Sequence, residues 1–354
     1  MDPTEEKIYL NGLNLLYWKS YPKFFSFIKS LQEKNKNFSF KEIFQNLENK
    51  EKSKIDLEKE WLKLQKEKID LIPLNSPSFP SLLKETSYPP LGIYLKGTIP
   101  KDSLSLAVVG TRKCTLYGKT VTEKIVKELV YYGFTIVSGL AYGIDTYAHK
   151  TTLENKGKTI AVLASGLNKI TPVINRKLAF KIIENGALIS EYPLNAPSLK
   201  SNFPLRNRII SGLSLGTLVI EANEKSGALI TANFALEQNR EVFAIPGSIF
   251  NKASVGTNNL IKKGAKLVNS IEDILEELRI DYSKIKNNFL FKDNLLTEKE
   301  KAIYEILKEE ELTSLDKILE ITNLKPNEAM ISLTELELKG LIKEISPQKY
   351  IRIK

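Results

Sequence analysis

Short runs of consecutive apolar residues alternate with helical patterns through the middle of the chain. A run that is apolar throughout is typical of a strand buried on both faces, as in a parallel sheet. Repeated β-α units therefore predict an α/β fold with a doubly wound, mostly parallel sheet and helices on both sides. The predicted strands are Leu106–Val109, Phe134–Val137, Thr159–Ala164, Ala187–Ser190, Thr217–Glu221, Glu241–Ile245 and Ala265–Val268. The predicted helices between them include Gly118–Tyr132, Ile144–Asn155, Asn175–Asn185 and Ala228–Asn239.

The first 70 residues show a different pattern, with a large apolar residue at every third or fourth position. This spacing predicts a small all-α domain over residues 1–70. Its helical segments are Lys7–Leu16, Tyr21–Glu33, Ser39–Leu47 and Ser53–Lys68. Prolines from Pro73 to Pro90 then interrupt any continuous helix and lead into the sheet domain, residues 71–280.

The end of the chain predicts a third domain. Residues 281–295 have the composition of a polar linker, and a helix start follows at Thr297. A second helix over Leu315–Thr322, a third opened by Pro326 and a hairpin over Ile342–Ile353 predict a winged helix at residues 296–354. The would-be recognition helix carries Glu328, Glu335 and Glu337, which would repel phosphates. We therefore interpret this domain as protein-binding or regulatory.

Composition excludes several classes of site. The 354 residues include one cysteine, Cys114, and one histidine, His149. One thiol forms no internal disulfide, which favours a reducing compartment, and one Cys with one His cannot build a structural zinc site. The N-terminus lacks the features of a signal peptide, and no stretch approaches the ~20 apolar residues of a membrane span. We expect a cytoplasmic protein with no membrane partner and no metal or other cofactor.

The net charge of +10 is concentrated in the sheet domain. Residues 1–75 carry 14 basic and 12 acidic side chains, residues 76–280 carry 25 and 16, and residues 281–354 carry 13 and 14. An anionic ligand is therefore expected on the sheet domain.

Ligands of a doubly wound sheet bind at the carboxyl ends of its strands. The first strand-helix turn, GTRKCTLYG, lacks the second and third glycines of a dinucleotide fingerprint, and no P-loop is present. Small residues at two predicted helix starts still favour the binding of a ligand with an anionic backbone. These possible phosphate-binding residues are Ser138, Gly139, Gly143, Ser226 and Gly227.

The predicted loop Lys200–Arg208 joins cations to an aromatic ring, Phe203. Cations for phosphates and an aromatic face for a base are what single-stranded nucleic acid requires. Thr111 and Arg112 in the neighbouring loop add another phosphate contact. The alternative is that Phe203 is a core residue and the arginines form surface ion pairs. The candidate single-stranded DNA (ssDNA) contacts are Thr111, Arg112, Lys200, Asn202, Phe203, Arg206, Asn207 and Arg208.

Two reactive residue types lie near these loops. His149 could pair with Asp145 one turn earlier, but no nucleophile accompanies it, so we expect a structural histidine. Lys113 could lower the pKa of the Cys114 thiol, yet a lone cysteine there is expected to be incidental. We assign no catalytic residue.

Seven stretches in order, over roughly residues 70–275, resemble the DNA processing protein A family, also called DprA or Smf. They are AVVGTRKCTLYG, IVSGLAYGIDTYAH, TIAVLASGL, LISEYPL, NFPLRNRIISGLS, LVIEANEKSGALITANFALEQNREVFAIPG and GTNNLIKKGA. The resemblance implies a helical domain like a sterile alpha motif, an extended Rossmann domain and a C-terminal winged helix.

The resemblance also implies a function: a non-enzymatic homodimer, built through the Rossmann domain, that binds ssDNA and loads the RecA recombinase in natural transformation or general recombination. By motif, the family's basic pocket matches Arg112, Lys200 and Phe203, whereas Arg206 and Arg208 match an element that orients the loop. Nothing in the residues themselves names RecA.

One stretch departs from the family pattern. The family's D-x-x-Y-P-x-x-N run is replaced by residues 168–175, which keep Pro172 and Asn175 but lack the Asp and Tyr. Lys169 or Arg176 could then supply a basic contact there. An alternative function is a nucleotide hydrolase of the lysine-decarboxylase-like group, whose catalytic glutamate would correspond to Glu221 behind Ser214–Thr217.

Overall fold

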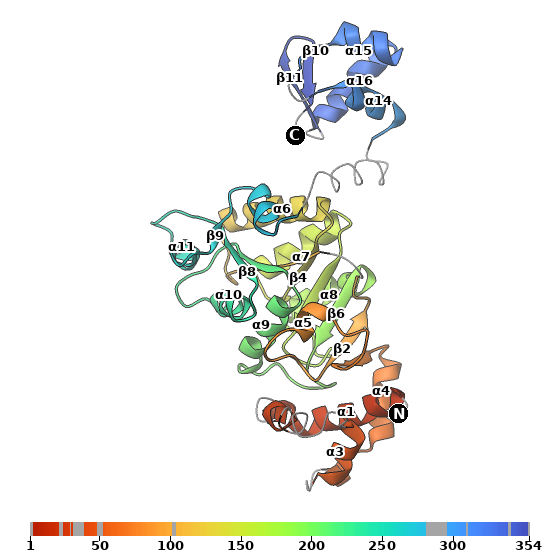
Figure 1. Cartoon of the computed structure of the whole chain (residues 1–354), viewed down its shortest axis with the longest axis vertical. Coiled ribbons are helices and arrows are strands. Elements are labelled where there is room, and N and C mark those ends of the chain that lie inside the picture. The colour runs from red at the N-terminus through yellow and green to blue at the C-terminus, as the bar shows by residue number, and fades with distance from the viewer. Residues whose placement is uncertain are drawn as a thin grey trace. The chain divides into compact units, whose positions relative to one another are not determined.

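The computed structural model divides into two compact units, Met1–Ile280 and Asp281–Lys354 (Figure 1). It describes residues 3–20, 24–28, 30, 39–47, 52–100, 104–280, 296–308, 311–338 and 341–352. The predicted linker, 281–295, lies outside the described residues. The domain boundaries expected from the sequence, including the division at residue 70, stay predictions.

Helices form the N-terminal part, as its apolar spacing predicts. The described elements are α1 (Pro3–Tyr17), the 3-10 turn η1 (Trp18–Ser20), α3 (Phe40–Asn46), η2 (Lys52–Lys54) and α4 (Leu57–Lys66). The predicted helix Tyr21–Glu33 lies partly outside the described residues. The side chains of Ser39 and Asp56 accept backbone N–H groups and so begin α3 and α4.

A nine-stranded sheet follows, in the order β1-β2-β6-β5-β4-β3-β7-β8-β9. All pairs from β6 to β9 are parallel, whereas β1–β2 and β2–β6 are antiparallel. The seven predicted strands are confirmed as β3 to β9. The edge strand β1 and its neighbour β2 flank the proline-rich stretch and were not predicted. The strands are β1 (Asp70–Pro73), β2 (Gly92–Gly97), β3 (Ser105–Val109), β4 (Thr135–Ser138), β5 (Thr159–Leu163), β6 (Gly186–Ser190), β7 (Gly216–Val219), β8 (Glu241–Ala244) and β9 (Lys266–Leu267).

Helices cover both faces of the sheet, and one of them corrects a prediction. The segment Lys200–Arg208, expected to be a loop, is largely the first two turns of helix α9 (Asn202–Gly212). The other elements of this unit are α5 (Ser81–Lys84), α6 (Leu116–Tyr131), α7 (Ile144–Glu154), η3 (Val173–Asn175), α8 (Arg176–Glu184), α10 (Gly227–Glu237), η4 (Lys252–Ser254), α11 (Val255–Lys262) and α12 (Glu272–Glu277).

Two hydrophobic cores lie on opposite faces of the sheet. Successive side chains of a strand point to opposite faces, and β5 follows this rule. Ala161 and Leu163 join a core that contains α8 and the N-terminal helices, while Ile160 and Val162 join a core that contains α9 and α10. Because strand order reverses at β3, right-handed crossovers place the two groups of helices on opposite faces.

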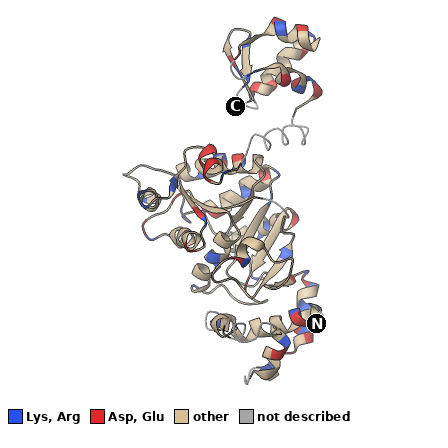
Figure 2. Cartoon of the chain, in the orientation of Figure 1, with Lys and Arg blue, Asp and Glu red and all other residues tan. Residues whose placement is uncertain are grey.

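The C-terminal unit is a winged helix, as predicted. Its elements are α14 (Glu298–Ile306), β10 (Thr313–Ser314), α15 (Leu315–Thr322), α16 (Pro326–Leu338), β11 (Ile342–Ser346) and β12 (Lys349–Arg352). Thr297 and Glu300 form a reciprocal capping box that begins α14. Figure 2 shows acidic and basic residues interspersed on this unit, and Glu328 of α16 pairs with Lys299 at 2.8 Å.

His149 is a core residue of α7, in agreement with the structural interpretation. Its side chain is fully buried and its Nδ1 lies 2.7 Å from Thr159 Oγ1. Thr159 Oγ1 donates to the Ile136 carbonyl, so it accepts from Nδ1, which therefore carries the ring proton. Burial, and then the positive charge of Arg206, lower the pKa of His149 from 6.5 to about 3.

We predict that this histidine makes the fold sensitive to mild acid. It stays neutral in the folded chain but takes up a proton below pH 6.5 when the chain unfolds. Its contribution to stability is thus complete above pH 6.5 and is lost as the pH falls toward 3. Between pH 6 and 5 the free energy of unfolding should fall by up to about 1.4 kcal/mol per pH unit.

Urea unfolding followed by circular dichroism across this range tests the prediction. His149 is the only histidine, so His149→Asn should remove most of the slope. An equally steep slope in that variant would assign the acid sensitivity to other groups.

Candidate nucleic-acid interface

A cavity of about 730 Å³ opens at the carboxyl ends of the central strands. Strand order reverses between β3 and β7, and the crevice outside such a reversal is the usual ligand site of this sheet type. The cavity, called the basic pocket below, is lined by residues after β3, β4, β7 and β8 and by the start of α9. Its lining includes Gly110, Thr111, Arg112, Lys113, Ala141, Asp145, Lys200, Phe203, Pro204, Arg206, Asn207, Asn223, Lys225, Ser226, Gly227, Lys252 and Ala253.

Five cationic side chains lie on the rim of the basic pocket and are exposed. None of them forms an ion pair with another residue that the structure describes, so their charge is available to a ligand. They are Arg112, Lys113, Lys200, Lys225 and Lys252. Lys225 and Lys252 were not singled out from the sequence. The signal for Lys225 was its position after a strand and directly before the SGALITA helix start.

Phe203 is half-buried at the start of α9, and two guanidinium groups lie close to its ring. The guanidinium carbon of Arg112 is 5.2 Å from the ring centroid, and that of Arg206 is 5.9 Å away. These cation-π contacts hold the ring in the pocket wall. The sequence-based alternative of surface ion pairs is wrong for the arginines, because Arg206 and Arg208 are buried and Arg112 has no ionic partner among the described residues.

Arg206 is the buried anchor of the pocket. Its Nη1 donates to the carbonyls of Gly139, at 2.7 Å, and Val162, which joins α9 to the ends of two strands. Asp145 lies nearby with its Oδ2 accepting the N–H groups of Gly139 and Ala141 at 3.1 and 3.3 Å. Burial lowers the pKa of Arg206 to about 10, against the opposing effect of Asp145, so the guanidinium stays charged at neutral pH.

Two further predicted DNA contacts are also buried. Arg208 pairs with Glu191, and its guanidinium carbon lies 4.4 Å from the centroid of the Tyr88 ring. Asn202 donates through Nδ2 to the Ala164 carbonyl at 3.1 Å. The DNA-binding assignment of Asn202, Arg206 and Arg208 stays a prediction, but their burial favours the role of positioning the pocket wall.

The two predicted phosphate-binding loops differ in what they leave accessible. In the first, Ser138 is buried and donates to the Val108 carbonyl at 2.7 Å, and the Gly139 N–H already binds Asp145. Gly143 has a φ of +74°, and a Cβ there would collide with the Thr111 carbonyl. This loop therefore shapes the pocket.

The second loop lies open at the start of an 11-residue helix, α10. Ser226 caps that helix by accepting the Ala228 N–H at 3.3 Å, and Gly227 is exposed. Asn207 of α9 donates to the Gly227 carbonyl at 3.2 Å and so ties the middle of α9 to the start of α10. An exposed helix start of this kind attracts anions.

Glu221 has the surroundings of a structural carboxylate. It is buried, and its Oε2 and Oε1 accept from the Thr115 N–H and hydroxyl at 2.9 and 2.5 Å. This arrangement gives no support to the hydrolase alternative. Burial and Glu221 together raise the pKa of the Cys114 thiol, opposite to the lowering that Lys113 alone would cause.

The altered stretch 168–175 lies outside the basic pocket and supports the loop between β4 and α7 that borders it. Asn175 Nδ2 donates to the Leu140 carbonyl at 2.9 Å and to Thr146 Oγ1 at 2.8 Å. Lys169 and Arg176 are not among the residues that line the basic pocket, and the Arg176 guanidinium carbon lies 5.9 Å from the Phe180 ring centroid. A DNA contact from this stretch stays a prediction.

Comparison with known proteins identifies the family. Residues 70–279 match the model of the DNA recombination-mediator protein A family, and residues 293–346 match the DprA winged helix domain. The chain belongs to the DprA/Smf family. It is 42% identical over 292 residues to Protein Smf of Escherichia coli K12, covering 80% of this chain and 77% of that protein. It is 46% identical over 212 residues to DNA processing protein DprA of Bacillus subtilis 168, covering 59% and 71%.

Solved DprA structures share the fold. DprA from Streptococcus pneumoniae aligns with a TM-score of 0.60 at 35% identity, over 71% of this chain and 90% of that one. DprA from Helicobacter pylori aligns with a TM-score of 0.54 at 30% identity, over 60% and 97%. The latter structure is described as revealing a single-stranded DNA binding mode of the H. pylori protein.

Two kinds of feature have no candidate among the described residues. No described helix is both long and apolar enough to cross a bilayer. No group of three or more His, Cys, Asp or Glu side chains among the same residues is arranged to hold a metal ion.

We predict that the Arg206 anchor is needed for stability. Arg206→Met should cost about 3–5 kcal/mol of unfolding free energy, because it leaves buried Asp145 without its cation and two carbonyls without a donor. The exposed Arg112→Ala variant, in the same pocket, should unfold nearly as the wild type does. Urea titrations of the three proteins test this, and an unchanged midpoint for Arg206→Met would show that Arg206 does not hold the pocket together.

Proposed function

We propose that this protein is a non-enzymatic recombination mediator that holds ssDNA in the basic pocket. The observation that carries the proposal is the half-buried Phe203 ring close to two guanidinium groups, inside a rim of five exposed cations without ionic partners among the described residues. A base of any identity can stack on an aromatic ring, and cations beside the ring bind the flanking phosphates. The H. pylori relative, whose structure is described with ssDNA, supports this assignment.

The pocket residues divide into two roles. A base stacks on Phe203, with its flanking phosphates against Arg112 and Lys200, and the open start of α10 at Gly227 takes a further phosphate. Thr111 and Asn207 line the same surface. The buried side chains of Asn202, Arg206 and Arg208 act on DNA only through the position they give to α9.

We further propose that the protein protects incoming ssDNA and loads RecA on it, in natural transformation or general recombination. It acts as a homodimer built through the Rossmann domain, in the cytoplasm. Membership of a family described as DNA recombination mediators supports the recombinase partner.

Substitution of the stacking ring should weaken binding to ssDNA. Phe203→Ala should lose about 1–3 kcal/mol, or about 5- to 150-fold in Kd, whereas Phe203→Trp should keep the stacking face and most of the affinity. For Arg112→Ala, the slope of log affinity against log salt concentration should become shallower by about 0.7 for each phosphate of the single strand that the variant no longer neutralises. Fluorescence anisotropy of labelled oligo-dT and the matching duplex, at low and moderate salt, measures both.

Lys158→Ala is the matched control for charge, since Lys158 is exposed and lies next to the amino end of β5, away from the pocket. An unchanged Kd for Phe203→Ala together with an unchanged slope for Arg112→Ala would rule out the pocket assignment. Equal weak binding to single strand and duplex would mean that the positive charge acts without selectivity. Sustained release of phosphate or base from nucleoside monophosphates would instead favour an enzyme.

RecA loading has its own readout. On ssDNA already coated with single-strand binding protein, RecA begins to hydrolyse ATP only after a lag, which the wild-type protein should shorten. At concentrations below its own Kd for ssDNA, the Phe203→Ala variant should give the same lag as a reaction that contains no mediator. A wild-type protein that binds ssDNA tightly but never shortens the lag would refute the recombinase partnership while leaving ssDNA binding intact.

A further inference from the structure

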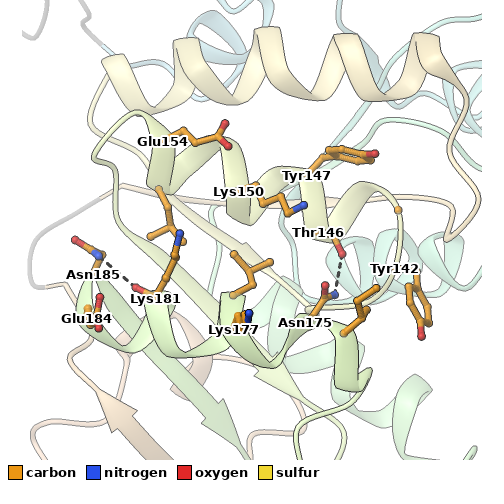
Figure 3. Close-up of a pocket in the computed structure, with 14 residues that line it drawn as sticks. Tyr142, Thr146, Tyr147, Lys150, Glu154, Asn175, Lys177, Lys181, Glu184 and Asn185 are labelled. Atoms are coloured by element: carbon orange, nitrogen blue, oxygen red, sulfur yellow. Dashed lines mark hydrogen bonds between the residues drawn. The ribbon is translucent and has the colours of Figure 1, made fainter.

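A second cavity, of about 760 Å³, lies in a groove between α7 and α8. Figure 3 shows side chains of both helices lining it, with the loop before α7 at one end. No predicted site residue other than Gly143 belongs to it. The lining consists of Tyr142, Gly143, Thr146, Tyr147, Lys150, Leu153, Glu154, Ile174, Asn175, Lys177, Leu178, Lys181, Glu184 and Asn185.

The groove and the basic pocket share one short loop. Ala141 and Asp145 line the basic pocket, whereas Tyr142 and Gly143, between them in sequence, line the groove. This loop is fixed from the groove side by Asn175, whose Nδ2 donates to Leu140 O and Thr146 Oγ1. From the pocket side it is fixed by Asp145, which accepts the Ala141 N–H. A strand that leaves the pocket across this loop therefore enters the groove at Tyr142.

The groove is cationic on the loop side of its carboxylates. Lys150 of α7 and Lys177 of α8 are exposed there, between Tyr142 and the carboxylates in Figure 3, and form no ion pair with a described residue. In Figure 3 the two carboxylates, Glu154 and Glu184, lie toward the opposite end of the groove, on the side of Lys181. Phosphates are thus attracted to the half beside the loop and repelled from the other half.

Aromatic surface accompanies these lysines. The Tyr142 side chain is 52% exposed at the mouth of the groove, and Tyr147 also lines the groove, with Lys119 Nζ 5.4 Å from its ring centroid. An exposed aromatic ring beside unpaired cations is the combination that ssDNA-binding surfaces use. The same combination occurs at Phe203 on the other side of the shared loop.

We propose that the loop-side half of this groove is a second subsite for the same single strand. Lys150 and Lys177 contact phosphates, and Tyr142 stacks on a base that has left the basic pocket. The proposal rests on the function proposed above and extends the path of the strand beyond the pocket. It implies that a short oligonucleotide fills the basic pocket alone, while a longer one also occupies the groove.

Binding of two lengths of oligo-dT tests the proposal. We would use about 5 and about 16 nucleotides, near the two limits of common ssDNA site sizes. The double variant Lys150→Ala/Lys177→Ala should bind the short oligonucleotide as the wild type does. For the long one its salt dependence should fall by about 0.7 for each phosphate that is no longer neutralised. Tyr142→Ala should weaken the long oligonucleotide about fivefold, and Tyr142→Phe should leave it unchanged.

Lys158→Ala again controls for the removal of charge, and Arg112→Ala controls for the basic pocket. Unchanged binding of the short oligonucleotide shows that the groove variants are folded. Groove variants that match Lys158→Ala on the long oligonucleotide, while Arg112→Ala weakens both lengths, would overturn the second subsite and leave the proposed function standing. Equal weakening of both lengths by the groove variants would also overturn it, since the groove would not be separate. No ssDNA binding by the wild type would overturn both.

Discussion

The basic pocket depends on one buried cation. A guanidinium removed from water is stabilised only if its protons are bound and its charge is balanced. Arg206 meets this need with the carbonyls of Gly139 and Val162 and with the nearby carboxylate of Asp145. These partners come from the ends of β4 and β5 and from α7, so one side chain fixes α9 against three elements. Glycine at residue 139 leaves room for this anchor, because a Cβ there would lie 2.7 Å from the guanidinium and would force it to shift.

The position of Phe203 follows from that anchor. Residues three apart on a helix lie on the same side, so the ring stands one turn before Arg206 and borders the same cavity. Arg208 secures the next part of the helix through Glu191 and Tyr88. The exposed chemistry of the pocket is thus held in place by side chains that are themselves almost fully buried.

Much of the fold was predictable from the sequence, because strands buried on both faces leave unbroken apolar runs such as Leu106–Val109. Helix α9 was missed for a physical reason. Its sequence starts Asn-Phe-Pro, and a proline normally indicates a break, yet Pro204 falls in the first turn, where a backbone N–H has no partner within the helix anyway. The residue types of the pocket were predictable too. The sequence did not predict which arginines are buried, because the burial of Arg206 depends on carbonyls that are distant in sequence.

The rim and the interior of the pocket place different demands on the chain. Lys113, Lys200, Lys225 and Lys252 have no ionic partner among the described residues and come from separate strand-end segments, so replacing one disturbs neither the core nor the other three. Mutations can therefore raise or lower the density of positive charge in single steps, without compensating changes elsewhere. The strength of the electrostatic attraction to an anionic ligand is thus adjustable separately from the stability of the scaffold beneath it.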